Sequence, residues 1–90
     1  MKPTRDQVKA AVIVALAEVS GLSPEKIKEE QVLKEYPLVL DDQQLNRLTL
    51  KLREYIKSID PPKTIWVTTV RKSGQTVKGL TDYIFKVPNS

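Results

Sequence analysis

Two adjacent carboxylates, Asp41 and Asp42, come closest to a chemically active pair in this sequence. Paired carboxylates can work as general acid and base when their surroundings drive their pKa values apart. Neighbouring side chains at a helix start point in different directions, however, and no histidine, cysteine or glycine-rich phosphate loop accompanies the pair. Helix capping explains both residues, because the Asp41 carboxylate can accept a hydrogen bond from a first-turn N–H group. We therefore expect that the protein is not an enzyme.

The absence of cysteine and histidine limits the possible chemistry further. It excludes thiol nucleophiles, disulfides, Cys/His zinc sites and catalysis by an imidazole base. We therefore expect neither a metal site nor a cofactor. The 90 residues favour a single domain, 1–90, with a modest core.

The positive charge lies in the carboxyl half of the chain. Residues 1–45 carry 6 Lys/Arg against 8 Asp/Glu, whereas residues 46–90 carry 9 against 3. A basic half permits binding to nucleic acid, anionic lipid or an acidic protein, although a solvated surface explains the same charge more simply. No stretch approaches the roughly 20 apolar residues that cross a membrane, and the first residues show no apolar signal-peptide core. We expect a cytoplasmic monomer that does not bind a membrane.

The most regular pattern in the chain extends from Leu38 to Ile59 and surrounds the two aspartates. With Asp41 as N-cap, Gln44 can complete a capping box, which predicts a helix over about 42–58. Its apolar residues recur at helical spacing and form one stripe: Leu45, Leu48, Leu52, Ile56 and Ile59.

A second capping box, Thr4 to Gln7, predicts the first helix over about 5–20, which Gly21 ends. Ser23 before Pro24 indicates a single helical turn in the long connection that follows. Four apolar residues are expected to hold this connection against the core: Leu22, Ile27, Val32 and Leu33.

The part of the chain after Pro61 and Pro62 allows two interpretations. Residues 64–70 are rich in β-branched side chains, so a hairpin over 64–78 competes with a short helix. A last helix is indicated by Val77, Leu80, Tyr83 and Ile84; Gly79 weakens it by about 1 kcal/mol and Pro88 ends it. The prediction is an all-α fold: a small four-helix bundle with three main helices and a short third element that is either helical or extended.

Four short motifs in this layout resemble the acyl carrier protein family. They are residues 21–27 (GLSPEKI), residues 38–43 (LVLDDQ), Thr76-Val77 and Asp82-Tyr83-Ile84. The resemblance covers about residues 5–85 and implies an acyl-carrier-like bundle. It also implies a serine at the start of the second helix, esterified to phosphopantetheine, whose thiol carries the acyl group.

The motif around the aspartates can be aligned with the family in two ways. With Gln44 at the serine position, Arg47, Lys51 and Glu54 would occupy buried positions, at a cost of several kcal/mol each. The alternative places Asp42 at the serine position and Asp41 at the preceding aspartate, and it is favoured. This alignment predicts that five residues of the second helix are buried, four apolar residues and one threonine: Leu45, Leu48, Thr49, Leu52 and Ile56.

In either alignment the attachment serine is missing. Asp42 has no hydroxyl group to esterify, and the serines of the chain lie elsewhere: Ser20, Ser23, Ser58, Ser73 and Ser90. The family's glycine before the motif is replaced by Val39, and the leucine after the serine by Gln43. We therefore expect no phosphopantetheine at the usual site.

The second helix also differs from the family in charge. The resemblance implies an acidic helix that docks on basic enzyme surfaces, whereas this helix is basic, so those enzymes would be repelled. Leu50 lies opposite the apolar stripe at the position where the family docks through an apolar residue; a lone exposed leucine is the simpler interpretation. The expected partner-binding residues are Leu50, Arg47, Lys51, Arg53 and Lys57.

Two functions remain open. The favoured one is a carrier-like protein-interaction module that lacks the phosphopantetheine serine and binds a protein through its second helix. The alternative is a small basic module for nucleic acid or another polyanion, although no recognition helix with interleaved aromatic residues is present.

Trp66 is interpreted as a cap on the core rather than as an exposed contact.

Overall fold

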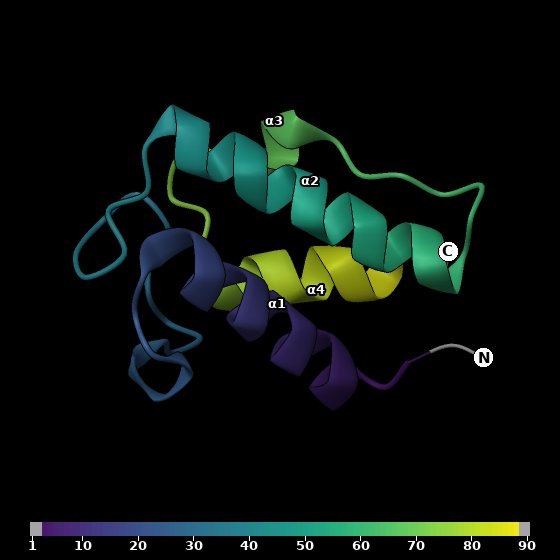
Figure 1. The fold of residues 1–90 in the computed structure, drawn as a ribbon, viewed down its shortest axis with the longest axis horizontal. Coiled ribbons are helices and arrows are strands. Elements are labelled where there is room, and N and C mark those ends of the chain that lie inside the picture. Colours follow the sequence, from purple (N-terminus) through teal and green to yellow (C-terminus); the bar gives the residue numbers. More distant parts are fainter. Residues whose placement is uncertain (1–2, 89–90) are drawn as a thin grey trace.

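The computed structural model describes residues 3–88, and their regular elements are all helical. The elements are α1 (Arg5–Ser20), the single 3-10 turn η1 (Pro24–Lys26), α2 (Asp42–Ile59), α3 (Val67–Val70) and α4 (Val77–Lys86). The predicted all-α fold, a small bundle of four helices, is confirmed. α2 and α3 lie above α1 and α4 in Figure 1, and the long connection between α1 and α2 projects at one end.

The boundaries of α1 follow from its capping residues, as predicted. The Thr4 hydroxyl accepts a hydrogen bond from the Gln7 N–H group, and the Gln7 side chain accepts one from the Thr4 N–H group. Gly21 ends the helix in the left-handed conformation, with a φ of 80°. α1 packs on both α2 and α4 and buries one stripe of apolar side chains: Val8, Val12, Ala15, Leu16 and Val19.

The long connection after α1 is held by buried side chains and by backbone hydrogen bonds to the start of α4. Of the four predicted anchors, Ile27 and Leu33 are buried, whereas Leu22 and Val32 are only partly so. Three backbone hydrogen bonds join it to the residues around the start of α4: Leu33 N–H to the Gln75 carbonyl, Val77 N–H to the Gln31 carbonyl and Lys78 N–H to the Glu29 carbonyl.

α2 buries the side chains that the favoured alignment predicts: Leu45, Leu48, Thr49, Leu52 and Ile56. Thr49 is accommodated because its hydroxyl donates to the Leu45 carbonyl over 2.8 Å, which satisfies a buried polar group within the helix. Ile59, at the end of the stripe, is only partly buried. Helical periodicity therefore identified the core side of this element correctly.

The alternative of a hairpin over 64–78 is wrong, because residues 67–70 form the one-turn helix α3. The Val70 N–H group donates to the Trp66 carbonyl, and the Gln75 side-chain amide donates to the Thr69 carbonyl over 2.9 Å. Ile65 and Val70 both enter the core. β-Branched residues favour strands mainly through packing, and here their packing partners lie in the helical core.

The interpretation of Trp66 as a core cap is also wrong. Its side chain is 67% exposed, while the preceding residue, Ile65, is fully buried. In the extended segment that leads into α3, successive side chains point to opposite sides, so burial of Ile65 directs Trp66 outward.

α4 closes the bundle and buries four of its side chains: Val77, Leu80, Thr81 and Ile84. The Thr76 hydroxyl accepts a hydrogen bond from the Gly79 N–H group at its start. The Tyr83 hydroxyl accepts from the Trp66 N–H group over 2.9 Å and so connects α4 to the segment before α3. None of the described helices is long and apolar enough to cross a membrane.

Candidate partner-binding face on α2

The start of α2 is closed by its own carboxylates. Asp41 Oδ1 accepts a hydrogen bond from the Gln44 N–H group over 2.8 Å, and Gln44 Oε1 accepts one from the Asp41 N–H group over 2.9 Å. Asp42 Oδ2 lies 2.9 Å from Arg71 Nη2, at the residue that ends α3. Both aspartates are exposed, and the described residues contain no group of three or more potential metal-ligating side chains. The pair therefore caps a helix and joins α2 to α3.

Val39, two residues before the cap, has an unusual backbone conformation. Its φ is 44°, and its side chain is 57% exposed. The left-handed region is unfavourable for a β-branched residue and is readily adopted by glycine. The chain enters α2 through a conformation that suits glycine better than the residue present.

The outward face of α2 carries Leu50, which is 57% exposed, in agreement with its predicted position opposite the core. Leu50 borders a hollow of ≈ 220 Å³ between α2 and α3. The hollow is lined by four residues of α2 and one of α3: Asn46, Thr49, Leu50, Arg53 and Val67. An apolar side chain and a guanidinium group thus lie together beside a recess.

The predicted basic residues of α2 do not all lie on this face. Arg53 lines the hollow, and its Nε donates to the Ile65 carbonyl over 3.1 Å; Arg47 and Lys57 are exposed. Lys51 lies on the opposite side of the helix, where its Nζ is 2.7 Å from Glu18 Oε2 of α1. The structure therefore brings Leu50 and Arg53 together and places Lys51 elsewhere.

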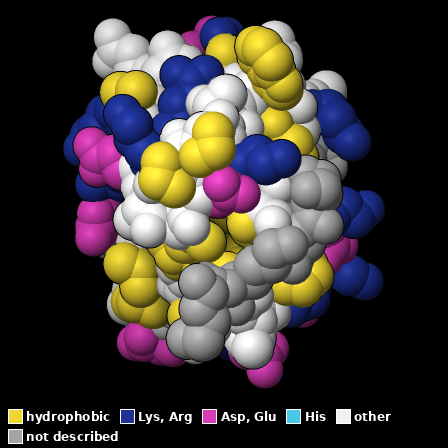
Figure 2. Space-filling view, turned by 90° about the vertical axis from the view of Figure 1, so that its right-hand side faces the viewer, with side chains coloured by type: hydrophobic (Ala, Val, Ile, Leu, Met, Phe, Trp, Pro, Cys, Tyr) yellow, Lys and Arg dark blue, Asp and Glu magenta, His cyan; other side chains and the backbone are white. Residues whose placement is uncertain are grey.

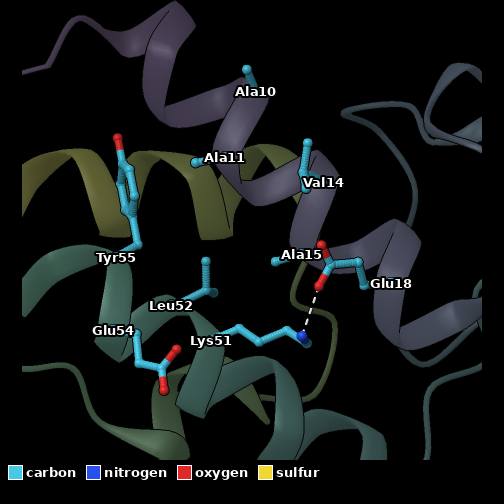
Figure 3. A pocket seen from close by; sticks show the side chains of 9 residues that line it. All are labelled: Ala10, Ala11, Val14, Ala15, Glu18, Lys51, Leu52, Glu54 and Tyr55. Carbon is cyan, nitrogen blue, oxygen red and sulfur yellow. Dashed lines mark hydrogen bonds and ion pairs between the residues drawn. The ribbon is translucent and has the colours of Figure 1, made fainter. Parts of the chain in front are cut away.

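Lys51 belongs to an open groove of ≈ 420 Å³ between α1 and α2. Figure 3 shows small apolar side chains from α1 and the Leu52 and Tyr55 side chains from α2 around it, with the Lys51–Glu18 ion pair at one end. Partial burial raises the pKa of the Tyr55 hydroxyl above its usual value, because the charged phenolate is poorly solvated there. The groove therefore combines an apolar floor with one ion pair at its end.

Two residues of this region were not predicted as part of the face. Trp66 precedes α3, and Arg71 follows it and pairs with Asp42. The sequence shows two adjacent apolar residues, Ile65 and Trp66, without indicating which of them is buried, and nothing local to residue 71 indicates a partner 29 positions earlier in the chain. Viewed from the end where α2 finishes, hydrophobic side chains lie among Lys and Arg side chains in the upper part of the molecule (Figure 2).

Comparison of the chain with family models, with curated proteins and with solved structures gives no match. A function must therefore be inferred from the residues and geometry described above.

Proposed function

We propose that this protein is an interaction module with an acyl-carrier-like fold that does not carry phosphopantetheine on its second helix. The observation that carries the proposal is the identity of Asp42, which stands where the resemblance places the attachment serine. An aspartate offers no hydroxyl to attack the pyrophosphate of coenzyme A. The burial of Leu45, Leu48, Thr49, Leu52 and Ile56 supports the alignment that puts Asp42 there.

The electrostatics at the start of α2 support the same proposal. A helix N-terminus normally favours a phosphate group, because its free N–H groups carry partial positive charge. Here Asp41 already accepts from the Gln44 N–H group, and Asp42 contributes a second negative charge. The first turn therefore already has one N–H group bonded to Asp41, and Asp42 is held by Arg71 at 2.9 Å, which leaves less of the helix start for a phosphodiester.

A partner is proposed to dock on the outward face of α2. Leu50 is 57% exposed and supplies an apolar contact, while Arg47, Arg53 and Lys57 supply positive charge around it. Partner interfaces commonly combine an apolar centre with a polar rim, and arginine is enriched in them. The charge of the face disfavours partners whose own surface is basic.

The chemical half of the proposal is tested by incubating the protein with a phosphopantetheinyl transferase and coenzyme A. Intact-mass spectrometry should show no added phosphopantetheine, while an established carrier protein in the same reaction should gain it completely. A mass gain would refute the proposal, and replacing the serines by alanine one at a time would then locate the attachment.

A polyanion-binding module is the second candidate, favoured by the excess of 9 Lys/Arg over 3 Asp/Glu in residues 46–90. Binding to generic DNA or RNA should then weaken steeply as salt is raised, because bound counterions are released. Filter binding at low salt that shows no complex would exclude this candidate.

A further inference from the structure

We propose that the docking face continues from α2 onto α3, and that its partner is an acidic segment whose apolar side chain enters the hollow between them. This inference rests on the proposed function, since it specifies the partner of the same face. It adds Trp66 and Val67 to the residues of α2 and gives the partner a definite chemistry.

The apolar part of the face comes from two separate elements. Leu50 of α2 is 57% exposed, and Trp66 at the start of α3 is 67% exposed. Between α2 and α3, the hollow beside Leu50 and Val67 has a volume of ≈ 220 Å³. Pockets for whole small molecules begin at roughly 300 Å³. The hollow is therefore suited to one protruding side chain rather than to a free ligand.

The walls of the hollow are fixed before any partner arrives. Arg53 Nε donates to the Ile65 carbonyl over 3.1 Å, which holds the segment before α3 against α2. The backbone N–H group of Trp66 donates to the Tyr83 hydroxyl of α4 over 2.9 Å, and Arg71 pairs with Asp42 at 2.9 Å. Because these contacts act at both ends of α3, a partner would meet a recess that is already formed.

The charges around the hollow determine the kind of partner. Arg47 and Lys57 are exposed, and neither takes part in the ion pairs found among the described residues. Glu54 follows Leu50 by one helical turn and is the single acidic residue among residues 46–59, where Arg47, Arg53 and Lys57 outnumber it. Carboxylates of a partner would gain favourable interactions here, and they would speed association. An acidic segment with one apolar anchor satisfies both the charge and the recess.

The test uses synthetic helical peptides titrated into the ¹⁵N-labelled full chain. The probe carries glutamates along one face and a single leucine among them, and matched peptides replace the leucine by serine or the glutamates by lysine. We expect amide shifts over residues 46–53 and 66–71 with the probe, at least about tenfold weaker binding without the leucine, and none with the lysine peptide. Trp66, the only tryptophan of the chain, should show a blue shift in its fluorescence.

Two variants and a control locate the contact. Leu50→Glu and Trp66→Ala should each weaken binding of the probe at least about fivefold, because each removes an apolar anchor. Val14→Glu introduces the same charge at a comparably exposed residue on α1, 50% exposed, and should leave the affinity unchanged. Dispersed ¹⁵N spectra of all three variants establish that they are folded.

The outcomes separate this inference from the proposed function. Shifts confined to α2, with affinity unchanged in Trp66→Ala, would overturn the extension onto α3 and leave docking on α2 intact. Equal affinity for the leucine and serine peptides would overturn the claim that an apolar side chain of the partner enters the hollow. Heparin is also titrated as a polyanion without an apolar anchor. If it binds as tightly as the probe peptide, and Leu50→Glu does not change its affinity, the face is a polyanion site and both proposals are overturned.

Discussion

The Asp42 carboxylate lies 2.9 Å from the Arg71 guanidinium, and this ion pair joins the first turn of α2 to the residue that ends α3. It occupies the point at which the resemblance to carrier proteins implies a prosthetic group. The aspartate therefore does more than lack a hydroxyl group: it takes part in an internal contact between two helices. Both side chains are partly exposed, so the pair is a modest stabilising contact rather than a buried salt bridge.

The contribution of this ion pair can be measured with a double-mutant cycle. Asp42→Asn, Arg71→Gln and the double variant should give a coupling free energy of about 0.5 kcal/mol, the usual size for an exposed pair. Chemical denaturation at low salt provides the free energies of unfolding. The coupling should shrink in high salt because ions screen exposed charges. A coupling near zero at low salt would show that the contact does not persist in solution.

Replacing Val39 should stabilise the protein. Its φ of 44° places a β-branched residue in the left-handed region, where the strain amounts to about 1–2 kcal/mol. Val39→Gly relieves that strain, but the added flexibility of glycine lowers the free energy of the unfolded chain by about 0.5–1 kcal/mol. We therefore expect the free energy of unfolding to rise by about 0.5–1 kcal/mol. Thermal denaturation measures the gain.

Val39→Asn supplies the matched comparison, because asparagine tolerates the left-handed region without the added flexibility of glycine. It should also be more stable than the original protein. If both variants unfold at a lower temperature than the original, the strain assigned to Val39 is not present in solution.

A packing contact opposes the replacement of Gly79 by alanine, although helix propensity favours that replacement. An added Cβ would lie only 2.5 Å from Gln75 Oε1, and Gln75 is 5% exposed and donates to the Thr69 carbonyl. Gly79→Ala gains about 1 kcal/mol in helix propensity but loses about as much by displacing Gln75. The free energy of unfolding should therefore change by less than about 0.5 kcal/mol.

The same substitution in a Gln75→Ala background removes the shorter of the two close contacts and leaves the one with Thr76 Oγ1 at 3.2 Å. There, Gly79→Ala should stabilise the chain by about 1 kcal/mol relative to Gln75→Ala alone. Urea denaturation of the four proteins gives the comparison. A full gain from Gly79→Ala in the original chain would contradict the role assigned to Gln75.

Tyr55 should make stability sensitive to alkaline pH. Burial raises the pKa of its hydroxyl in the folded state above the unfolded value of about 10, so the unfolded chain loses this proton first. Stability from Tyr55 is therefore fully present below pH ~10 and falls as the pH rises above it. Thermal denaturation from neutral to alkaline pH should show a smaller decline for Tyr55→Phe.

Tyr36 provides the control for that experiment. Its side chain is 88% exposed, so Tyr36→Phe reports the effect of removing a tyrosine hydroxyl that is not buried. An identical decline in all three proteins would show that burial of Tyr55 does not contribute.

Most helical boundaries could be predicted because their causes are local. Thr4 with Gln7 and Asp41 with Gln44 form capping boxes within four residues, and both are present. The apolar spacing of α2 likewise identified its buried side without knowledge of any partner helix. The choice between a hairpin and a helix over 64–78 was different, since it depends on burial of Ile65 and Val70 in the core and on the hydrogen bond from Arg53 to the Ile65 carbonyl.

The composition of the face on α2 was only partly predictable for the same reason. The outward position of Leu50 follows from 100° steps along one helix, and it is exposed as expected. Lys51 was grouped with the same face, but Glu18, 33 residues away in the chain, draws its ammonium group to the α1 side. The exposure of Trp66 depends on which of two neighbouring residues enters the core, and Ile65 does.

The sequence by itself determined the start and end of the main helices, their buried stripes and the absence of a hydroxyl group at residue 42. Those features depend on side chains within a few positions of one another. Only the tertiary structure decided that residues 67–70 form a helix, that Arg71 pairs with Asp42, and that a hollow separates α2 from α3. Each of these requires contacts between segments that are distant in the chain, and helical spacing contains no information about which distant segment will meet which.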